Sequence, residues 1–393
     1  MPILLPRGIP QASDFEHLLV FQKISRFRGT RGLTRKDLLK KNIQRFGSSQ
    51  RTNYVSDDGE RIDDCFNIMP LTYALPHEYN AFVAGYSSIQ KIGMGKSNFW
   101  IIKPVGLSRG RGISLVNDIT DVSYSQPIVI QRYISNPLLF LGFKFDLRIY
   151  VLVSSFDPLE AFIYKEGLAR FGSQLYSSRP DSLHDTRIHL TNSSIQKEFG
   201  CEVDKSHPAF LAGLNGAESK VAMSWLWKRL DAVGIDTNAL WEKIVDVCLK
   251  SLIAAGSEIP NQPNSFELFG FDVMFDQQLK CWLIEVNSSP SLGCDSPLDI
   301  RVKESLVRDT IALVDPPAYD RKALADVCQR RLTQRKASCN ISSVDVLEKD
   351  LARILMNKLP RAYGEIPSRM GNFQRIAPGT NYFDRLNKRK KNR

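Results

Sequence analysis

Residues 282–291, WLIEVNSSPS, place a carboxylate and an amide inside an otherwise apolar strand. Side chains two residues apart on a β-strand point to the same face, so Glu285 and Asn287 share one face. A carboxylate that is buried without a partner carries a large free-energy cost. We therefore expect Glu285 to bind a cation or to take part in a reaction.

A second acidic strand precedes this one. FELFGFDVMFD at 266–276 and KCWLIEVN at 280–287 are separated only by QQL, which predicts a β-hairpin. Pairing of Asp276 with Cys281 places Met274 opposite Leu283.

The same register places Asp272 opposite Glu285. Two carboxylates that face each other directly repel, so they indicate a shared cation. Asn287 adds a carbonyl oxygen on the same face, and three hard oxygen ligands suit Mg²⁺. The alternative is a solvated sheet face whose acids are incidental.

A charged row lies in KFDLRIY, residues 144–150, where alternation gives the strand two different faces. One face carries Lys144, Asp146, Arg148 and Tyr150. The other face is apolar and carries Phe145, Leu147, Ile149 and Val151. The charged row is either an exposed face with cross-strand pairs or the floor of a site for a phosphorylated ligand, to which Arg148 would bind in bidentate fashion.

A glycine- and arginine-rich loop follows a third apolar strand in WIIKPVGLSRGRGISLV, residues 100–116. The strand delivers Lys103, Gly110 and Gly112 allow close backbone approach to a phosphate, and Arg109 and Arg111 supply charge. The spacing matches neither G-x-x-x-x-G-K-[ST] nor G-x-G-x-x-G before a helix, so the loop is predicted to be a flap between two strands.

Together these elements predict one site for ATP and Mg²⁺, because phosphoryl transfer needs positioned cations more than a covalent nucleophile. The sequence shows no Ser-His-Asp or Cys-His arrangement that we would prefer to this interpretation. We expect His189, in HLTNSS, to be structural rather than catalytic.

The remaining patterns indicate a mixed α/β protein. Strands are predicted over 98–104, 112–116, 127–134 and 143–156, with the sheet continuing through 159–171. Helices are predicted over 34–46, with Thr34 as N-cap, over two segments of 218–256, the second from Thr237, and over 299–314, 321–336 and 344–358. The 393-residue chain is 43% hydrophobic, which is typical of a globular protein.

Composition narrows the class of protein. The seven cysteines are scattered without a Cys-x-x-Cys pair, which indicates reduced thiols in an intracellular protein. The first residues lack the apolar core of a signal peptide, and no apolar run is long enough to span a bilayer. The net charge of +11 lies after the proline pair at 316–317, where residues 318–393 hold 18 basic and 7 acidic side chains. This basic tail favours a polyanionic partner, although simple solvation or a targeting signal is the alternative.

These motifs resemble the tubulin–tyrosine-ligase-like family of the ATP-grasp superfamily, and most of all its glutamate ligases. The resemblance runs from Gly32 to Val314 and is carried by FWIIKPVGLSRGRGI, IVIQRYISNPLL, KFDLRIYVLV, EGLARF, HLTNSS, FELFGFDVMFD and WLIEVNSSPSL. It implies an ATP-grasp fold with an N-terminal subdomain at 1–97, a central subdomain at 98–190 and a C-terminal subdomain at 191–317. A basic tail, helical or disordered, follows at 318–393.

The resemblance also implies roles for individual residues. The nucleotide would be bound by Lys103, Arg109, Gly110, Gln131, Arg132, Tyr133, Ile134, Lys144, Phe145, Asp146, Thr191 and Asn192. Asp272, Glu285 and Asn287 would bind Mg²⁺, and Arg148 would stabilise the transferred phosphoryl group. The amino-acid substrate would be bound by Arg170, Lys220 and Lys303, although the segment around Lys220 departs from the family's Gly-x-Lys-Trp pattern. HLTNSS also differs from the family's HLTNYS at Ser193.

The implied activity is ATP-dependent addition of free L-glutamate to glutamate side chains in the acidic tails of tubulin, through an acyl phosphate. The alternatives are the same chemistry with glycine and a non-catalytic microtubule-binding protein. Nucleic-acid binding is disfavoured, because the basic tail has few interleaved aromatic residues and no recognition motif. A monomer is expected in the cytoplasm, on microtubules and in cilia or basal bodies, without a membrane partner.

Overall fold

The computed structural model describes most of the chain between residues 18 and 380. The described residues are 3–4, 15, 18–50, 66–91, 98–107, 110–123, 125–192, 195–196, 206–212, 219–336, 344–358 and 360–380.

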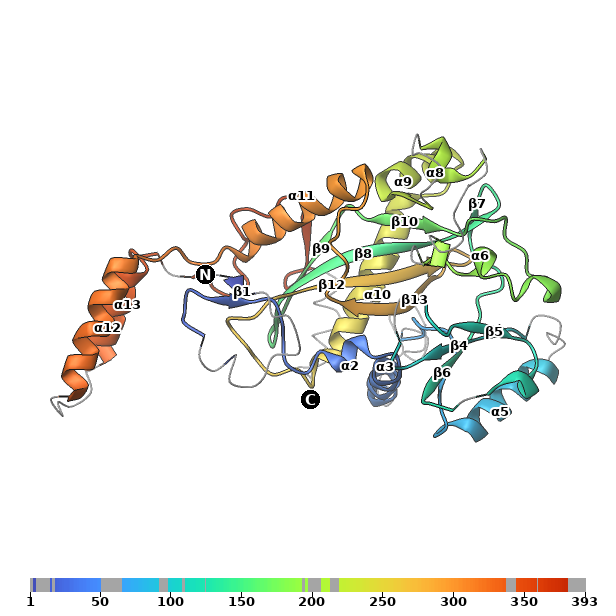
Figure 1. Ribbon diagram of the computed structural model, residues 1–393, viewed down its shortest axis with the longest axis horizontal. Helices are drawn as coiled ribbons and strands as arrows, with labels where there is room; N and C mark the ends of the chain where they lie inside the picture. Colours follow the sequence, from blue (N-terminus) through green and yellow to red (C-terminus); the bar gives the residue numbers. More distant parts are fainter. Residues whose placement is uncertain are drawn as a thin grey trace.

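An antiparallel sheet built around one long strand, β8 (Phe143–Phe156), forms the centre of the protein (Figure 1). Its main path runs β11 (Lys220–Ala222), β10 (Leu168–Phe171), β8, β12 (Glu267–Phe275) and β13 (Cys281–Ser288). The described strands that complete this eight-stranded sheet are β7 (Leu139–Phe140), β9 (Leu159–Tyr164) and β14 (Phe373–Ala377).

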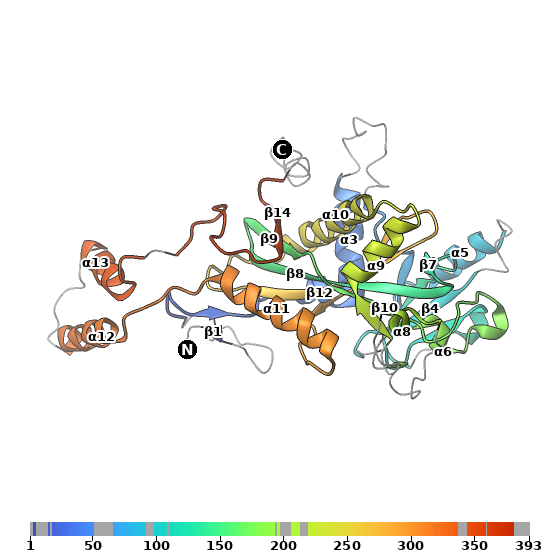
Figure 2. The ribbon, with the colours of Figure 1, turned by 90° about the horizontal axis from the view of Figure 1, so that it is seen from above.

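Alternation along β8 separates two cores, as its sequence predicts. Phe145, Leu147, Ile149 and Val151 are buried in one cluster with the apolar side of α10 (Thr237–Gly256). Tyr150 and Leu152 belong to a second cluster with α11 (Pro297–Val314). Seen from above, the sheet therefore lies between α10 on one face and α11 on the other (Figure 2). Each large apolar side chain that is fully buried contributes about 1.5–3 kcal/mol.

A smaller antiparallel sheet stands beside the first. Its strands follow the order β3 (Thr72–Leu75), β6 (Ile128–Arg132), β4 (Trp100–Pro104) and β5 (Ser114–Val116). Helix α5 (Tyr79–Ile89) covers one face, where Phe82 packs edge-on against Trp100. Strand β3 and helix α5 precede residue 98, so this sheet begins before the boundary that we expected at 97.

Helix α3 (Lys36–Gln50) follows the short helix α2 (Arg31–Thr34) and connects the two sheets. Lys36 forms an ion pair with Glu285 of β13, and Lys40, one turn later, pairs with Glu78 beside α5. Thr34 ends α2 instead of capping the helix that we predicted from residue 34. The N-terminal part of α3 thus reaches both walls of the space between the sheets.

The tail contains the two helices that we predicted and, in addition, a strand that we did not predict. Helices α12 (Arg321–Lys336) and α13 (Val344–Ile354) form a hairpin that projects from the body in both views (Figures 1 and 2). The chain then returns, and β14 pairs with β9 in the large sheet. Arg361 also forms an ion pair with the buried Glu160. The predicted disorder of the last residues lies outside the described part of the chain.

The remaining described elements are short or lie at the ends of the sheets. They are β1 (Ile3–Leu4), β2 (Lys23–Ile24), the 3₁₀ turns at Ile119–Asp121 and Pro180–Ser182, α6 (Thr186–His189), α8 (Pro208–Leu211) and α9 (Met223–Ala232). The second predicted helix of 218–256 does begin at Thr237, where the Asp236 carboxylate caps it by accepting from Asn238 N. Within the described ranges no helix has the length and apolarity required to cross a bilayer.

Candidate active site

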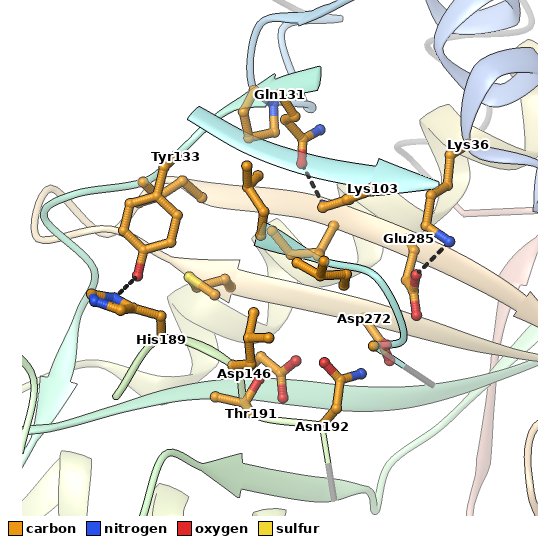
Figure 3. Close-up of a pocket in the computed structure, with 18 of the residues that line it drawn as sticks. Lys36, Lys103, Gln131, Tyr133, Asp146, His189, Thr191, Asn192, Asp272 and Glu285 are labelled. Atoms are coloured by element: carbon orange, nitrogen blue, oxygen red, sulfur yellow. Dashed lines mark hydrogen bonds and ion pairs between the residues drawn. The ribbon is translucent and has the colours of Figure 1, made fainter. Parts of the chain in front are cut away.

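A pocket between the two sheets gathers most of the residues that the sequence singles out (Figure 3). Its polar lining comes from strands β4, β6, β8, β10, β12 and β13, from the start of α3 and from the segment after α6. The sequence-predicted residues that line it are Lys103, Gly110, Gln131, Arg132, Tyr133, Ile134, Lys144, Asp146, Arg170, Thr191, Asn192, Asp272 and Glu285. Residues separated by up to 182 positions in the sequence therefore meet at one place.

The pocket also has an apolar lining, which can accept a flat ring. Tyr133, after the end of β6, lines the pocket as well, and it donates its backbone N–H to Phe99 O where the chain leaves the small sheet. The apolar side chains lining the pocket are Ile101, Leu107, Ile113, Ile134, Leu190, Met274 and Ile284. Phe145, which we expected to contribute to nucleotide binding, turns its side chain away into the core.

Two buried lysines enter the pocket from different sheets. Lys103 donates to Gln131 Oε1 at 2.7 Å, and Gln131 in turn donates to Thr72 Oγ1 at 2.8 Å. Lys144 donates to the hydroxyl of Tyr133 at 2.9 Å and to His189 O at 2.7 Å. Within the described part of the chain, neither ammonium has a carboxylate at ion-pair distance, so both are available to a bound anion.

Burial makes these ammonium groups easy to deprotonate. It lowers the pKa of Lys103 to about 8, although Glu285 acts in the opposite direction. Burial likewise lowers the pKa of Lys144 to about 7, against the effect of Asp146. Phosphate groups would restore the full charge of both lysines, since a nearby anion favours the protonated form.

His189 supports this arrangement from behind. Its Nε2 is 3.0 Å from Ser182 O, an acceptor, so Nε2 carries the proton and Nδ1 accepts from the Tyr133 hydroxyl at 2.9 Å. Burial, aided by Lys144, lowers the pKa of His189 to about 4, which keeps the ring neutral. His189 thus fixes Tyr133 and, through it, Lys144, which agrees with the structural role that we expected.

A row of alternating charges crosses the large sheet below the lysines. Arg148 Nε lies 2.5 Å from Asp272 Oδ1, and Arg170 Nη2 lies 2.9 Å from Asp272 Oδ2. Arg170 also donates to Asp146 through Nε at 2.7 Å. Burial acts to raise the pKa of Asp272, but the two guanidinium groups outweigh it and hold this pKa well below its usual range. Asp272 is therefore ionised at neutral pH.

The acidic hairpin has a register that differs from our expectation. Phe275, not Asp276, pairs with Cys281, and Leu283 faces Val273 instead of Met274. An irregularity between Asp272 and Val273 then inserts one extra residue on β13.

Because of this β-bulge, Asp272 does face Glu285, as we predicted. The extra residue is Ile284, which lines the pocket beside Glu285. The bulge thus brings a carboxylate to the pocket from each strand of the hairpin.

The oxygen atoms of this hairpin fit a divalent cation. Asn287 Nδ2 lies 3.4 Å from Asp272 Oδ2 and 3.2 Å from Glu285 Oε1, so the amide touches both carboxylates. A flip of the Asn287 amide would turn its carbonyl oxygen Oδ1 toward both carboxylates. Two carboxylates and one amide carbonyl form the hard-ligand set that Mg²⁺ uses. No group of three or more His, Cys, Asp or Glu side chains suited to a metal occurs among the described residues.

The flap between β4 and β5 closes one end of the pocket. Gly110 and Gly112 have φ angles of +77° and +68°, which favour glycine. A Cβ at Gly110 would lie 2.3 Å from Ile195 Cδ1, so a larger residue would force the flap or the Ile195 side chain to shift. Arg109 and Ser193 lie outside the described residues.

The predicted amino-acid ligands form a second group beside the first. Arg170 faces Lys220 across β10 and β11. Lys220 and Lys303 do not line the pocket; both form ion pairs with Asp299. Of these three cations, only Arg170 lines the pocket, and it also pairs with Asp146 and Asp272.

Sequence reasoning missed two residues. Lys36 lies 3.3 Å from Glu285 Oε2 and lines the pocket, but it belongs to none of the motifs that the sequence singles out. The sequence around Asp299 does not indicate its ion pair, because its partner Lys220 is 79 residues away.

Comparison with known proteins identifies relatives of the whole domain. Residues 14–323 match the model of the "Tubulin-tyrosine ligase family". The Homo sapiens protein named "Tubulin polyglutamylase TTLL5" is 40% identical over 301 residues, which cover 75% of this chain and 22% of that protein. "Probable tubulin polyglutamylase TTLL2" of Homo sapiens is 37% identical over 294 residues, covering 75% of this chain and 46% of the relative.

A third match covers nearly the whole chain. "Tubulin polyglutamylase ttll6" of Danio rerio is 35% identical over 379 residues, which cover 91% of this chain and 44% of the relative. The chain thus spans less than half the length of each of these three relatives.

Proposed function

Because the chain belongs to the tubulin–tyrosine ligase family, we propose that it is an ATP-dependent ligase that joins free L-glutamate to glutamate side chains of tubulin. The single observation that carries the proposal is the pocket between the sheets. It combines two buried lysines, for which the described residues supply no carboxylate at ion-pair distance, with an array of arginines and acids. The relatives are named as polyglutamylases, which favours glutamate as the amino acid.

In this proposal the two antiparallel sheets are the lobes of an ATP-grasp fold. Lys103 and Lys144 bind phosphate oxygens, the apolar end of the pocket takes the adenine, and the Gly110 flap closes over the phosphates. Thr191 and Asn192 line the same end of the site.

Asp272, Glu285 and Asn287 would hold Mg²⁺, which would neutralise charge on the phosphate oxygens. With Glu285 engaged by the metal, Lys36 would be available to another anion. The acceptor carboxylate takes the γ-phosphoryl group, and the glutamate amine displaces phosphate from the resulting acyl phosphate. Arg148, fixed by Asp272, stabilises the charge on the transferred group.

The acidic tails of tubulin are the proposed acceptor. The basic tail after Pro317 and the projecting α12–α13 hairpin would raise the concentration of the enzyme on an anionic microtubule. A location on cytoplasmic microtubules, including those of cilia, and action as a monomer follow as parts of the same proposal.

Mass spectrometry of tubulin tails tests the substrate. Purified microtubules are incubated with the protein, ATP and Mg²⁺, together with glutamate, glycine or tyrosine in separate reactions. Addition of glutamate alone supports the proposal. Addition of glycine alone would keep the mechanism and replace the amino acid, and no addition despite ATP binding would favour a non-catalytic microtubule-binding protein.

A further inference from the structure

A second cavity lies toward the opposite end of β8 from the candidate active site. Its volume is about 240 Å³, whereas about 10–15 Å³ is enough for one water molecule, so it can hold a small organic molecule. Ser154 and Ser155 line it, and Ser154 lies six residues beyond Arg148, which is about 20 Å along the strand. Val314, the last residue of α11, and Pro317 also line it. The cavity therefore lies where the chain leaves the body toward the projecting hairpin (Figure 2).

Segments that are distant in the sequence meet in this cavity. Lys23 on β2 lies beside Ser265, which precedes β12, because its neighbour Ile24 forms a parallel bridge with Ser265. Arg361 and Tyr363 belong to the tail that returns to the large sheet. A ligand in the cavity would thus contact the N-terminal segment, the sheet and the tail.

Lys23 supplies a positive charge to the cavity. Its ammonium donates to Pro263 O at 3.0 Å, and within the described ranges no carboxylate lies at ion-pair distance from it. Burial lowers the pKa of Lys23, and the guanidinium of Arg361 lowers it further. An ammonium has three donors, so two remain for a ligand. A half-buried cation with another cation nearby is stabilised by a bound anion.

The two acids of the lining do not cancel this charge. Glu160 is buried, is paired with Arg361 and also accepts from the hydroxyl of Ser154. Asp315 is exposed, so water screens its charge. Among the described lining residues, the ammonium of Lys23 therefore remains without a compensating charge.

The hydroxyl of Ser265 is a second unsatisfied group. Ser265 is only 3% exposed, and its Oγ has no hydrogen-bond partner among the described residues. A buried hydroxyl without a partner is unfavourable, and a ligand oxygen would satisfy it. The cavity also has apolar walls, formed by Pro158, Pro263, Phe266, Val314, Pro317 and Pro360.

We propose that this cavity binds a small phosphate monoester, whose phosphate oxygens accept from Lys23 and Ser265 and whose organic part packs on the apolar walls. A phosphate presents three terminal acceptor oxygens, so it suits donors that come from different segments of the chain. The site is separate from the proposed ligase activity. Because Arg361 and Tyr363 of the tail line the same cavity, the bound ligand stabilises the contact between the tail and the body.

Calorimetric titration of the full chain with phenyl phosphate tests the proposal. A non-hydrolysable ATP analogue and Mg²⁺ are present at saturation, so that the candidate active site is already occupied. The variants are Lys23→Met and Ser265→Ala, of which the second removes an unpartnered hydroxyl and should fold like the wild type. Lys243→Met is the matched control, because Lys243 also donates to a backbone carbonyl, Leu279 O at 2.9 Å, but does not line the cavity.

We expect Lys23→Met to weaken the binding of phenyl phosphate about 10- to 100-fold and Ser265→Ala about 2- to 10-fold. Lys243→Met should bind like the wild type. Absence of binding by the wild type would overturn the proposal, as would unchanged affinity in both cavity variants. An equal loss in Lys243→Met would also overturn it, because that result indicates unspecific attraction to a basic protein.

Competition and hydrogen exchange test the two further parts of the proposal. Inorganic phosphate lacks the organic part and benzoate lacks the third oxygen, so both should compete more weakly than phenyl phosphate. Equal competition by benzoate would contradict the phosphate assignment. Phenyl phosphate should slow amide exchange in residues 360–377 of the wild type but not of Lys23→Met, and unchanged exchange in both would contradict the stabilisation of the tail.

Discussion

Arg148 and Asp272 face each other on the neighbouring strands β8 and β12, and Nε of Arg148 lies 2.5 Å from Oδ1 of Asp272. Arg170 approaches the other carboxylate oxygen at 2.9 Å. One buried acid therefore fixes two guanidinium groups, of which that of Arg170 lines the pocket. This arrangement leaves Asp272 paired even when one arginine is replaced.

Arg148→Lys should impair the reaction much more than the fold. Lysine provides a point charge and cannot reproduce the planar fork of arginine, so stabilisation of the transferred phosphoryl group is lost. We expect kcat to fall on the order of 10²–10³-fold, with ATP affinity and melting temperature little changed. Steady-state kinetics with a nucleotide-binding titration check this, and wild-type turnover in the variant would show that Arg148 has another role.

The two buried lysines should make ATP binding dependent on pH. In the free protein the pKa is about 8 for Lys103 and about 7 for Lys144, and bound phosphates raise both values. Binding must then take up protons, so ATP affinity should fall as the pH rises from 7 to 9. Calorimetry in buffers of different ionisation enthalpy measures the uptake. Lys144→Met should reduce it, and an uptake of zero in the wild type would refute the account.

The same lysines should shape the stability of the free protein. The pKa values of the two lysines are lower in the folded protein than in the unfolded chain. At a pH between the folded and unfolded pKa values, the unfolded chain therefore binds more protons than the folded protein. Their contribution to the free energy of unfolding therefore increases with pH between about 7 and 10. Urea titrations of the wild type and Lys144→Met should show a smaller increase in the variant, whereas identical slopes would contradict it.

The flap glycine offers a matched pair of substitutions. Gly110 and Gly234 both have φ above +70°, but an added Cβ meets Ile195 at Gly110 and no atom within 4 Å at Gly234. Both alanine variants should lose about 1–2 kcal/mol of stability from backbone strain. Only Gly110→Ala should also raise the KM for ATP, because the flap must shift. Equal KM values in the two variants would show that the flap does not contact the nucleotide.

The returning tail should contribute to stability through a buried ion pair. Arg361 pairs with Glu160, whose side chain is only 4% exposed, whereas Arg353 and Asp326 form a pair that is 59% and 49% exposed. Arg361→Ala leaves a buried carboxylate without its guanidinium and should cost about 3–5 kcal/mol. Arg353→Ala should cost about 0–1 kcal/mol. Urea unfolding of both variants distinguishes them, and equal losses would contradict the assigned burial.

The sequence predicted the parts of the site that depend on alternation along one strand. The limits of β8 and the opposite faces of Lys144 and Phe145 follow from period-two patterning. The pairing of Asp272 with Glu285 was predicted from a register that was itself wrong by one residue. The bulge at Ile284 restores the pair, and nothing local in KCWLIEVN marks a bulge.

Contacts between residues that are distant in the sequence could not be predicted from alternation along a strand. Lys36 reaches Glu285 only because α3 crosses between the two sheets, and Asp299 finds Lys220 only after α11 packs on the large sheet. Strand β14 was missed because FQRIA is short, and its position depends on the edge offered by β9.

The most direct test of the account is ATP-dependent transfer of radiolabelled glutamate to microtubules by the wild type and by Glu285→Gln. The substitution keeps the size of the side chain and removes one of the two carboxylates that face each other in the hairpin. The account predicts incorporation by the wild type and none by the folded variant. Incorporation at the same rate by both proteins, or by neither while ATP still binds, would contradict it.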